Sequence, residues 1–320
     1  MIGKILITGG AGFIGSNFIR YFLNAHPGVK TVNLDKLTYC GNPENLAGLE
    51  KEPNYEFVKG DICDEDIVAR VMAGTDAVIH FAAESHVDNS IKDPLVFTKT
   101  NVLGTHILLE AARKSGIKKF LHISTDEVYG SVIEGSSKET DALNPSSPYS
   151  ASKAAAELVV RGFWKTFGFP AVIVRGSNAF GPRQYPEKLM PLFITNLLEN
   201  KKVPLMGDGM HRRSWVYVLD FCRAVDFVFE KGIFGEVYNI PGTIELANMD
   251  VTKKILSLLD KNESFIERVP DRFGHDQRYS VDGAKLQSLG WRAESDFEES
   301  LKETVEWYKN NEEWWKKLKK

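Results

Sequence analysis

The chain has 320 residues, of which 43% are hydrophobic and 26% are charged, and its formal net charge is −3. These values are typical of a soluble globular protein with one large core or two domains that share a cleft, and the charge argues against a nucleic-acid or anionic-membrane surface. No apolar run reaches the roughly 18 residues of a membrane span, and three scattered cysteines favour neither a disulfide framework nor a zinc site. Because Met1–Ile7 leads straight into a motif, we expect no signal peptide and a cytoplasmic protein.

The first expected element is a short strand that runs into a glycine-rich turn. A β-branched run at Lys4–Thr8 is followed by glycines at positions 9, 12 and 15, and an apolar helix pattern extends over Phe13–Leu23. Glycine lets the backbone turn tightly and approach a pyrophosphate, whose charge then lies at the helix N-terminus. The order of strand, turn and helix therefore predicts a dinucleotide site.

The second expected strand, Thr31–Leu34, ends in Asp35, twenty residues after the last glycine of the turn. A carboxylate there accepts from both ribose hydroxyls and repels a 2′-phosphate, so the sequence favours NAD over NADP. The competing interpretation is an Asp that caps the next turn. A third strand, Tyr55–Val58, leads to Asp61 and Ile62, which could frame an adenine ring or equally begin the helix that follows.

Two further strands continue the pattern. Ala77–Ala83 is continuously apolar, as a parallel strand buried on both faces requires, and small residues at its end would let a dinucleotide pass closely. Asp93 and Pro94 open a helix expected over Leu95–Ser115, and Lys119–Ile123 is the next strand. This alternation predicts an α/β fold with a right-handed, doubly wound parallel sheet, whose ligands bind at the carboxyl ends of the strands.

Protic side chains gather at the end of that last strand. Thr125, Asp126 and Glu127 place a hydroxyl beside two adjacent carboxyl groups, and Tyr149 and Lys153 share one face of the following helix. A phenol, with a pKa of about 10, is a useful base at neutral pH only when a nearby cation stabilises the phenolate. Lys153 and a nicotinamide ring are such cations. The alternative is a surface Tyr and a solvated Lys.

These features resemble the extended short-chain dehydrogenase/reductase superfamily, which combines a glycine-rich turn, an acid after the second strand and Y-x-x-x-K. Within it, T-D-E-V-Y-G at 125–130 and A-A-E-S-H-V-D at 82–88 resemble the dTDP-glucose 4,6-dehydratases, as do the segments at 185–189, 238–240 and 271–276. The likeness covers nearly the whole chain. Its most specific part is the Asp126–Glu127 pair, because epimerases and decarboxylases of the same fold usually lack it.

The resemblance implies a domain organisation and a set of partners. A Rossmann domain is expected at residues 1–176, with returning segments at about 215–230 and 237–241, and a smaller, interleaved C-terminal substrate domain at 177–320. The expected cofactor is NAD, with no metal, and the expected substrate is a nucleotide sugar, dTDP-glucose. A homodimer is expected through helices around 95–115 and 149–167, with no nucleic-acid or membrane partner. Such an enzyme would serve deoxysugar biosynthesis, as in the making of dTDP-rhamnose.

The resemblance also implies three sets of site residues. The catalytic set contains the protic groups described above: Thr125, Asp126, Glu127, Tyr149 and Lys153. The cofactor-binding set follows the strand ends of the first half: Gly9, Gly12, Phe13, Ile14, Gly15, Asp35, Lys36, Thr38, Asp61, Ile62, Phe81, Ala82, Ala83, Ser85, Thr100, Ser124, Tyr149, Lys153 and Ala179. The substrate-binding set is drawn largely from the second half: Ser85, Thr125, Asn178, Glu187, Lys188, Val203, Leu205, Arg213, Asn248, Arg272, His275 and Asp276.

The implied reaction removes water without net redox change. Tyr149 would take the proton of the sugar C4 hydroxyl while hydride leaves C4, Glu127 would remove the C5 proton, and Asp126 would protonate the departing C6 hydroxyl before hydride returns to C6. One carboxyl group must be ionised while the other is protonated, so their environments must separate their pKa values.

Four positions depart from the family pattern, and they keep alternatives open. Ala179 and Phe180 replace an amide and a phenol, and His211 and Ser214 differ from the motif G-D-G-x-N-V-R-D-W. A dehydratase for a UDP- or GDP-linked hexose therefore remains open, and a nucleotide-sugar 4-epimerase or decarboxylase is the nearest rival. A catalytically silent NAD-binding scaffold is disfavoured because the acid, phenol and ammonium positions are intact.

Overall fold

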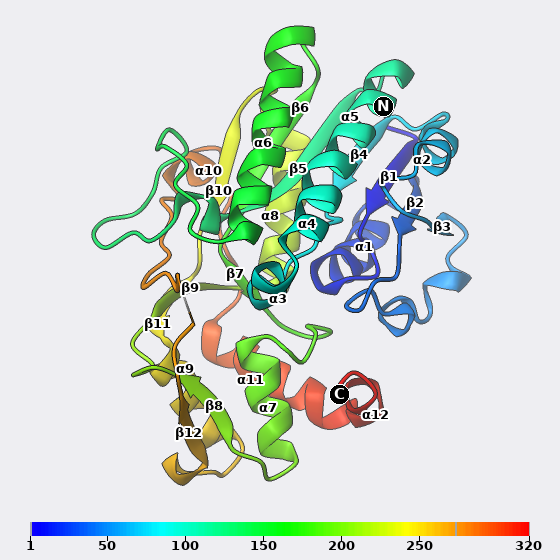
Figure 1. The fold of residues 1–320 in the computed structure, drawn as a ribbon. Helices are drawn as coiled ribbons and strands as arrows, with labels where there is room; N and C mark the ends of the chain where they lie inside the picture. The colour runs from blue at the N-terminus through cyan, green and yellow to red at the C-terminus, as the bar shows by residue number, and fades with distance from the viewer. Residues whose placement is uncertain (1, 273, 320) are drawn as a thin grey trace.

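In the computed structural model, which describes residues 2–272 and 274–319, a seven-stranded parallel sheet forms the centre of the molecule (Figure 1). Its strand order is β10–β6–β5–β4–β1–β2–β3, and every neighbouring pair is parallel. Its strands are β1 (Lys4–Thr8), β2 (Lys30–Asp35), β3 (Tyr55–Lys59), β4 (Ala77–His80), β5 (Lys119–Thr125), β6 (Ala171–Gly176) and β10 (Val237–Ile240). The prediction of a doubly wound α/β fold is confirmed.

Helices cover both faces of the sheet, and the alternation along β1 shows how. Ile5 and Ile7 belong to a core cluster shared with one pair of helices, whereas Leu6 between them belongs to a second cluster on the opposite face. The first face is covered by α1 (Phe13–Ala25) and α8 (Val218–Lys231), and the second by α2 (Glu65–Met72), α5 (Thr105–Ser115) and α6 (Pro148–Phe167).

The strand after α2 is shorter than its apolar run predicted. β4 ends at His80 rather than at Ala83, although the Phe81 amide still donates to the Thr8 carbonyl at 3.0 Å. Beyond that point the backbone turns toward the glycine-rich loop, where a side chain on Gly9 would lie 2.6 Å from the Ala82 backbone. The small residues that follow β4 therefore line the turn after β1 instead of extending the strand.

The helix expected over Leu95–Ser115 is one continuous segment with a wider turn in its middle. It begins as α4 (Pro94–Phe97), passes through the π-helical segment η3 (Thr98–Gly104), and continues as α5 to Gly116. Within the wide turn, the Asn101 side chain accepts from the Glu84 amide at 2.8 Å and donates to the Ser152 hydroxyl at 2.8 Å. The π turn thus joins the loop after β4 to helix α6.

The second half of the chain builds smaller units beside the carboxyl ends of the strands (Figure 1). Its strands are β7 (Asn178–Phe180), β9 (Arg212–Tyr217) and β11 (Ile244–Ala247) in one sheet and β8 (Val203–Met206) and β12 (Ile266–Val269) in another. The remaining helices are α3 (Val87–Lys92), α7 (Leu189–Leu198), α9 (Asn248–Leu258), α10 (Ala284–Ser288), α11 (Phe297–Asn310) and α12 (Glu312–Lys316). Short 3₁₀ turns are η1 (Pro43–Leu46), η2 (Leu49–Lys51), η4 (Asp126–Tyr129) and η5 (Glu263–Phe265).

The chain returns to the large sheet after entering these units. Helix α8 packs against α1, and β10 pairs with β6, with Val237 opposite Ile173. The two halves are therefore interleaved in sequence, and each fixes the position of the other. Among the described residues, no helix combines the length and apolarity needed to cross a membrane.

Candidate active site

A cavity of about 300 Å³ lies at the carboxyl ends of the central strands. Every residue predicted to bind the cofactor lines it, from Gly9 to Ala179, and so does every predicted catalytic residue. From the predicted substrate-binding set, it is also lined by Ser85, Asn178, Glu187 and Lys188. The structure thus brings together motifs that lie far apart in the sequence.

The glycine-rich turn leaves no room for side chains at two positions. Gly9 has φ +75°, and a Cβ there would lie 2.6 Å from the Ala82 backbone. A Cβ on Gly15 would lie 2.3 Å from the Gly9 carbonyl oxygen. The turn between β1 and α1 therefore requires glycine, and it presents bare backbone to the cavity at the N-terminus of a helix.

Asp35 lies buried at the end of β2, where its carboxylate holds the turn in place. One oxygen accepts from the Ala11 amide at 2.8 Å and the other from the Leu37 amide at 2.7 Å. Burial raises the pKa of Asp35, and these two donors oppose the rise. Each oxygen keeps a second lone pair for a ligand hydroxyl.

Asp61 and Ile62, which could frame an adenine ring, follow the end of β3 and line the cavity. Asp61 lines the cavity and pairs with Lys36 at 2.7 Å. The N-cap of α2 is Asp64, whose side chain accepts from the amides of Asp66 and Ile67. Of the two interpretations that the sequence left open, the helix cap therefore belongs to Asp64, and Asp61 remains available to the cavity.

The two adjacent carboxyl groups occupy the first turn after β5. Thr125 caps the short turn η4: its hydroxyl accepts from the Glu127 amide and donates to Asp126 Oδ1, both at 3.3 Å. Asp126 is 3% exposed, and its Oδ2 has no hydrogen-bond partner among the described residues. The buried, half-satisfied carboxyl group is therefore an expensive place for a negative charge.

The two carboxyl groups have different electrostatic surroundings. Burial, helped by the neighbouring Glu127, raises the pKa of Asp126 to about 8. Burial also raises the pKa of Glu127, but Lys188, Arg272 and Arg213 all oppose that rise, whereas Arg213 is the one basic side chain that opposes it at Asp126. At neutral pH the site favours a protonated Asp126 beside a Glu127 that faces three cations.

Tyr149 and Lys153 lie on the first turns of α6, which begins with a capping box between Ser147 and Ser150. Burial, with the charges of Glu127 and Asp126, raises the pKa of Tyr149. Lys153 is 5% exposed and donates to the Ile123 carbonyl at 2.6 Å, and burial lowers its pKa to about 8. The stabilisation of a Tyr149 phenolate by the Lys153 ammonium stays a prediction.

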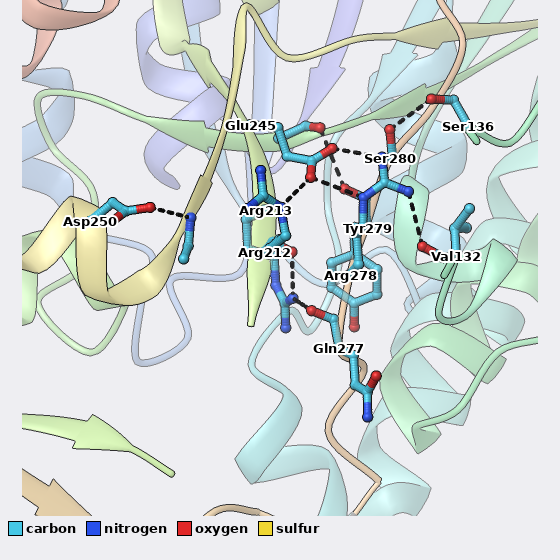
Figure 2. A network of polar contacts seen from close by, with 12 residues as sticks. Val132, Ser136, Arg212, Arg213, Glu245, Asp250, Gln277, Arg278, Tyr279 and Ser280 are labelled. Carbon is cyan, nitrogen blue, oxygen red and sulfur yellow. Dashed lines mark hydrogen bonds and ion pairs between the residues drawn. The ribbon is translucent and has the colours of Figure 1, made fainter. Parts of the chain in front are cut away.

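Figure 2 shows a polar network around Arg213, one of the predicted substrate residues. The Arg213 guanidinium donates to His275 Nε2 at 3.0 Å and to the Asp276 carbonyl at 2.9 Å, and it lies 4.2 Å from the centre of the Tyr279 ring. The Tyr279 hydroxyl lies 2.7 Å from Asp276 Oδ2 and 3.4 Å from Glu127 Oε2. Tyr279, which sequence reasoning missed, thus links Arg213 to the acid pair.

The same network anchors the segment that carries these residues. Arg278 makes a two-pronged ion pair with Glu245 on β11, at 2.9 and 2.8 Å, and Glu245 also accepts from Arg212 on β9 at 2.6 Å. Arg278 donates further to the carbonyls of Val132 and Gly135 in the loop after η4 (Figure 2). Residues 275–280 are therefore held between the three-stranded sheet of β7, β9 and β11 and the loop that follows η4.

Other predicted substrate residues occupy the mouth of the cleft or lie beyond it. Lys188 donates to the Ser85 carbonyl at 2.9 Å, and Glu187 accepts from Tyr39 at 2.8 Å. Arg272 lies 3.5 Å from Asp88, and the Asn248 side-chain oxygen is buried without a partner among the described residues. Phe273, which belongs to the same segment, lies outside the described residues.

Val203 and Leu205, from the predicted substrate-binding set, do not line this cavity. They are 0% and 1% exposed and belong to the hydrophobic core, while Pro204 and Met206 are partly exposed. Successive side chains of a strand point to opposite faces, so a ligand contact of Val203 or Leu205 through its side chain is disfavoured, and their place in the substrate set stays a prediction.

Several cavity residues carried no pattern that sequence reasoning could use. They include Cys40 and Gln184, which lie in loops, and Phe221, which lies on α8. Glu84 and Tyr185 also line the cavity, and they lie inside the segments 82–88 and 185–189 that carry the family resemblance.

His211, Asp271 and His275 form a cluster whose donor atoms lie within 4.8 Å of one another. Asp271 pairs with His275 Nδ1 at 2.6 Å and with His211 Nε2 at 3.1 Å, and the two rings stack at 3.9 Å with an interplanar angle of 19°. Nearly parallel rings direct their lone pairs side by side rather than to one point. Asp271 therefore holds the two imidazole rings together by hydrogen bonds, and one of them, His275, contacts Arg213.

Comparisons with known proteins agree with this geometry. The sequence matches the family described as GDP-mannose 4,6 dehydratase over residues 6–304. It is 48% identical to a dTDP-glucose 4,6-dehydratase of Streptomyces niveus over 99% of this chain and 96% of that one. The crystal structure of DesIV, a dTDP-glucose 4,6-dehydratase of Streptomyces venezuelae with NAD and dTDP bound, is 48% identical with a TM-score of 0.97 over 99% and 100% of the two chains. A UDP-glucose 4-epimerase of Thermotoga maritima is 32% identical with a TM-score of 0.89 over 96% and 99%.

The electrostatic coupling inside the acid pair gives a direct prediction. Replacing Glu127 by Gln removes the neighbouring charge that helps to raise the pKa of Asp126, so that pKa should fall below its value of about 8 in the unmodified protein. Carbon-13 NMR of labelled aspartate carboxyl groups measures it. The control is Glu56→Gln on the exposed strand β3, and an unchanged Asp126 pKa in Glu127→Gln would contradict the coupling.

Proposed function

The chain belongs to the GDP-mannose 4,6-dehydratase family and, within it, to the dTDP-glucose 4,6-dehydratases, and we propose that its cleft converts dTDP-glucose to dTDP-4-keto-6-deoxyglucose and water. The activity is that of an NAD-dependent hydro-lyase. The observation that carries the proposal is the adjacent Asp126–Glu127 pair, with Asp126 buried, in the cavity that Tyr149 and Lys153 also line. A phenol and an ammonium suffice for oxidation, whereas elimination of water needs an acid and a base in different protonation states.

The cavity suits NAD because its walls are bare backbone where a pyrophosphate would lie. Gly9 and Gly15 have no space for a Cβ, and Asp35 closes the end where an adenosine ribose would bind. We infer that these residues, with the rest of the cofactor set given above, hold the dinucleotide. When bound, NAD⁺ takes a hydride from sugar C4 and later supplies one to C6.

The first proton transfer is assigned to Tyr149. Its phenolate oxygen accepts the proton of the C4 hydroxyl, and the Thr125 hydroxyl donates to the same sugar oxygen. The raised pKa of Tyr149 in the ligand-free protein shows that burial and the nearby carboxylates oppose the phenolate. A cation is therefore needed beside it, and Lys153, four residues along the same helix face, supplies that charge.

Elimination is assigned to the acid pair. The 4-keto group makes the C5 proton acidic, and Glu127 accepts that proton as a carboxylate. Burial raises the pKa of Glu127, and Lys188, Arg272 and Arg213 oppose that rise. Asp126, whose pKa of about 8 keeps it protonated at neutral pH, donates its proton to the C6 hydroxyl, which leaves as water. The two roles follow from the different surroundings of the two groups.

Substrate binding is assigned to the side of the cleft built by the second half of the chain. We propose that residues 177–320 form most of this substrate domain, and residues 1–176, with returning segments at about 215–230 and 237–241, the NAD domain. Arg213 offers a planar fork of donors that suits a diphosphate. The Arg213 guanidinium is held in place by the Asp276 backbone carbonyl, to which it donates, and by the Tyr279 ring, over which it lies.

A nucleotide-sugar 4-epimerase is the alternative with the same fold. It would use the phenol and the ammonium but would leave the acid pair without a task, and the solved epimerase is less similar to this chain than DesIV is. Specificity for UDP- or GDP-linked hexose is the second alternative, because His211 and Ser214 depart from the family pattern close to Arg213.

One incubation separates these possibilities. The purified protein is given dTDP-glucose, UDP-glucose or GDP-mannose in separate reactions, and the products are measured by mass spectrometry. We expect the mass of one water to be lost from dTDP-glucose. An unchanged mass with an altered sugar configuration would identify an epimerase, and loss of water from another donor alone would correct the choice of nucleotide.

Single substitutions should separate the two halves of the reaction. Asp126→Asn keeps the size of the side chain but cannot donate the acid proton, so elimination should slow by about 10²- to 10⁴-fold while C4 oxidation persists and NADH absorbance accumulates. In Tyr149→Phe the oxidation itself should fail, and no NADH absorbance should appear. Full dehydration by Asp126→Asn, or unaltered oxidation by Tyr149→Phe, would remove that residue from its role.

We also propose that the protein is a cytoplasmic homodimer. All three cysteines are free, which supports a reducing compartment. Large apolar side chains are exposed together on the helices that cover one side of the large sheet. They are Ile91, Leu95, Val96, Leu103, Leu158 and Phe167, with Leu95 73% exposed. The segments that carry them contact one another, so they form one apolar face suited to a second copy.

Charged substitutions on this face test the dimer. Leu103→Glu with Leu158→Glu should shift the protein from dimer to monomer in light scattering coupled to size-exclusion chromatography, because two carboxylates would be buried at the interface. Ile233→Glu, at a residue that is 61% exposed between α8 and β10, is the control and should leave the dimer intact. A monomeric unmodified protein would contradict the proposal.

A further inference from the structure

A fully buried ion pair, Glu157–Arg175, lies behind the proposed catalytic groups and has no part in the steps above. Both side chains are 0% exposed, and Arg175 Nε donates to Glu157 Oε1 at 2.9 Å. Burying two charges is costly even when they are paired, and well-packed apolar residues would often serve stability as well. The pair therefore calls for a reason other than stability, and its neighbours provide one.

The first neighbour is Lys153. Tyr149, Lys153 and Glu157 follow one another at intervals of four residues and so share one face of α6. Lys153 donates to the carbonyl of Ile123, while Glu157 accepts from the hydroxyl of the next residue, Ser124, at 3.0 Å. The ammonium and the carboxylate thus reach adjacent residues at the end of β5.

The other titratable groups that face Lys153 carry no negative charge. His80 on β4 and His122 on β5 are buried, and burial together with the Lys153 charge lowers the pKa of both, so they are neutral. Burial lowers the pKa of Lys153 to about 8, and the Glu157 charge is the influence that opposes this fall. Within the described residues, Glu157 is therefore the counter-charge of Lys153.

The second neighbour is the turn that carries the acid pair. Arg175 donates from Nη1 to the Tyr129 hydroxyl at 2.6 Å, and its guanidinium lies 4.6 Å from the centre of the Tyr129 ring. Tyr129 is the last residue of η4, and its hydroxyl in turn donates to Asn239 on β10 at 2.9 Å. The far end of the Asp126–Glu127 turn is therefore braced by the arginine that Glu157 holds.

We propose that Glu157 is a positioning residue for both halves of the reaction: its carboxylate keeps Lys153 a cation and, through Arg175 and Tyr129, holds the turn that carries Asp126 and Glu127. Its charge, and not only its shape, is essential to this role. An amide at position 157 would fill the same space but would leave two buried cations without their shared anion. The kinetic part of this inference rests on the proposed function; the electrostatic part does not.

A titration of the substrate-free protein tests the electrostatic part. Carbon-13 NMR of labelled lysine ε-carbons reports the pKa of Lys153, with its signal assigned by its loss in Lys153→Arg. In Glu157→Gln that pKa should fall by about one unit, because an opposite charge has been removed. In Arg175→Gln it should rise, because Glu157 is no longer neutralised by its partner. The two variants predict opposite signs, so either one that folds is informative.

A matched control removes a carboxylate from another buried cluster. Asp226 on α8 accepts from Tyr21 and pairs with His26, both on the α1 side of the sheet. Asp226→Asn should destabilise the protein while leaving the Lys153 pKa unchanged. A Lys153 pKa that is the same in Glu157→Gln as in the unmodified protein, or that moves equally in Asp226→Asn, would overturn the inference.

The pH dependence of C4 oxidation, followed by NADH absorbance, tests the kinetic part. A lysine that must be protonated acts below its pKa and is lost as the pH rises through it, so the alkaline limb in Glu157→Gln should move to lower pH by the same interval as the titration. Glu157→Asp keeps the charge and should keep that limb. An unmodified protein that dehydrates no nucleotide sugar would defeat the proposed function alone, whereas an active one whose Glu157→Gln variant keeps its alkaline limb would defeat this inference.

Discussion

Two neighbouring carboxyl groups at the end of β5, one buried and one partly exposed, are the constraint on which the rest of the site depends. Burial alone would raise the pKa of both and leave two neutral acids. The second half of the chain breaks this symmetry. Lys188 and Arg272 oppose the rise of the Glu127 pKa, whereas neither is among the main influences on the Asp126 pKa. The roles of acid and base that we propose for the two side chains follow from this difference in their surroundings.

The interleaving of the two halves of the chain keeps Lys188 and Arg272 in place relative to Glu127. The cations belong to loops outside the large sheet, whereas the acids lie at a strand end within it. Because β10 pairs with β6 and Arg278 ties residues 275–280 to both Glu245 and the loop after η4, the halves cannot separate freely. Tyr279, which contacts both Arg213 and Glu127, makes ligand recognition and acid–base chemistry parts of one polar network.

The sequence predicted whatever is encoded locally and failed where distant segments decide the outcome. The glycine-rich turn, Asp35 and the helix pair Tyr149 and Lys153 each follow from spacing within one element, and all of them line the cavity. The strand Val203–Met206 is apolar throughout, so nothing in its sequence pattern shows that Val203 and Leu205 are the buried residues. The Tyr279–Glu127 contact joins residues 152 positions apart, and no periodicity can indicate such a pairing.

Burial also bears on the pH range in which Asp126 and Lys153 keep the protonated forms that the proposed reaction needs. Asp126 must be protonated to act as an acid, and Lys153 must be protonated to support a phenolate. Burial raises the pKa of the first and lowers that of the second, and both arrive at about 8. If the proposed roles hold, both residues lose their active forms as the pH rises through this range. Burial moves the pKa of an acid and that of a base in opposite directions, while Glu127 adds to the rise at Asp126 and Glu157 opposes the fall at Lys153.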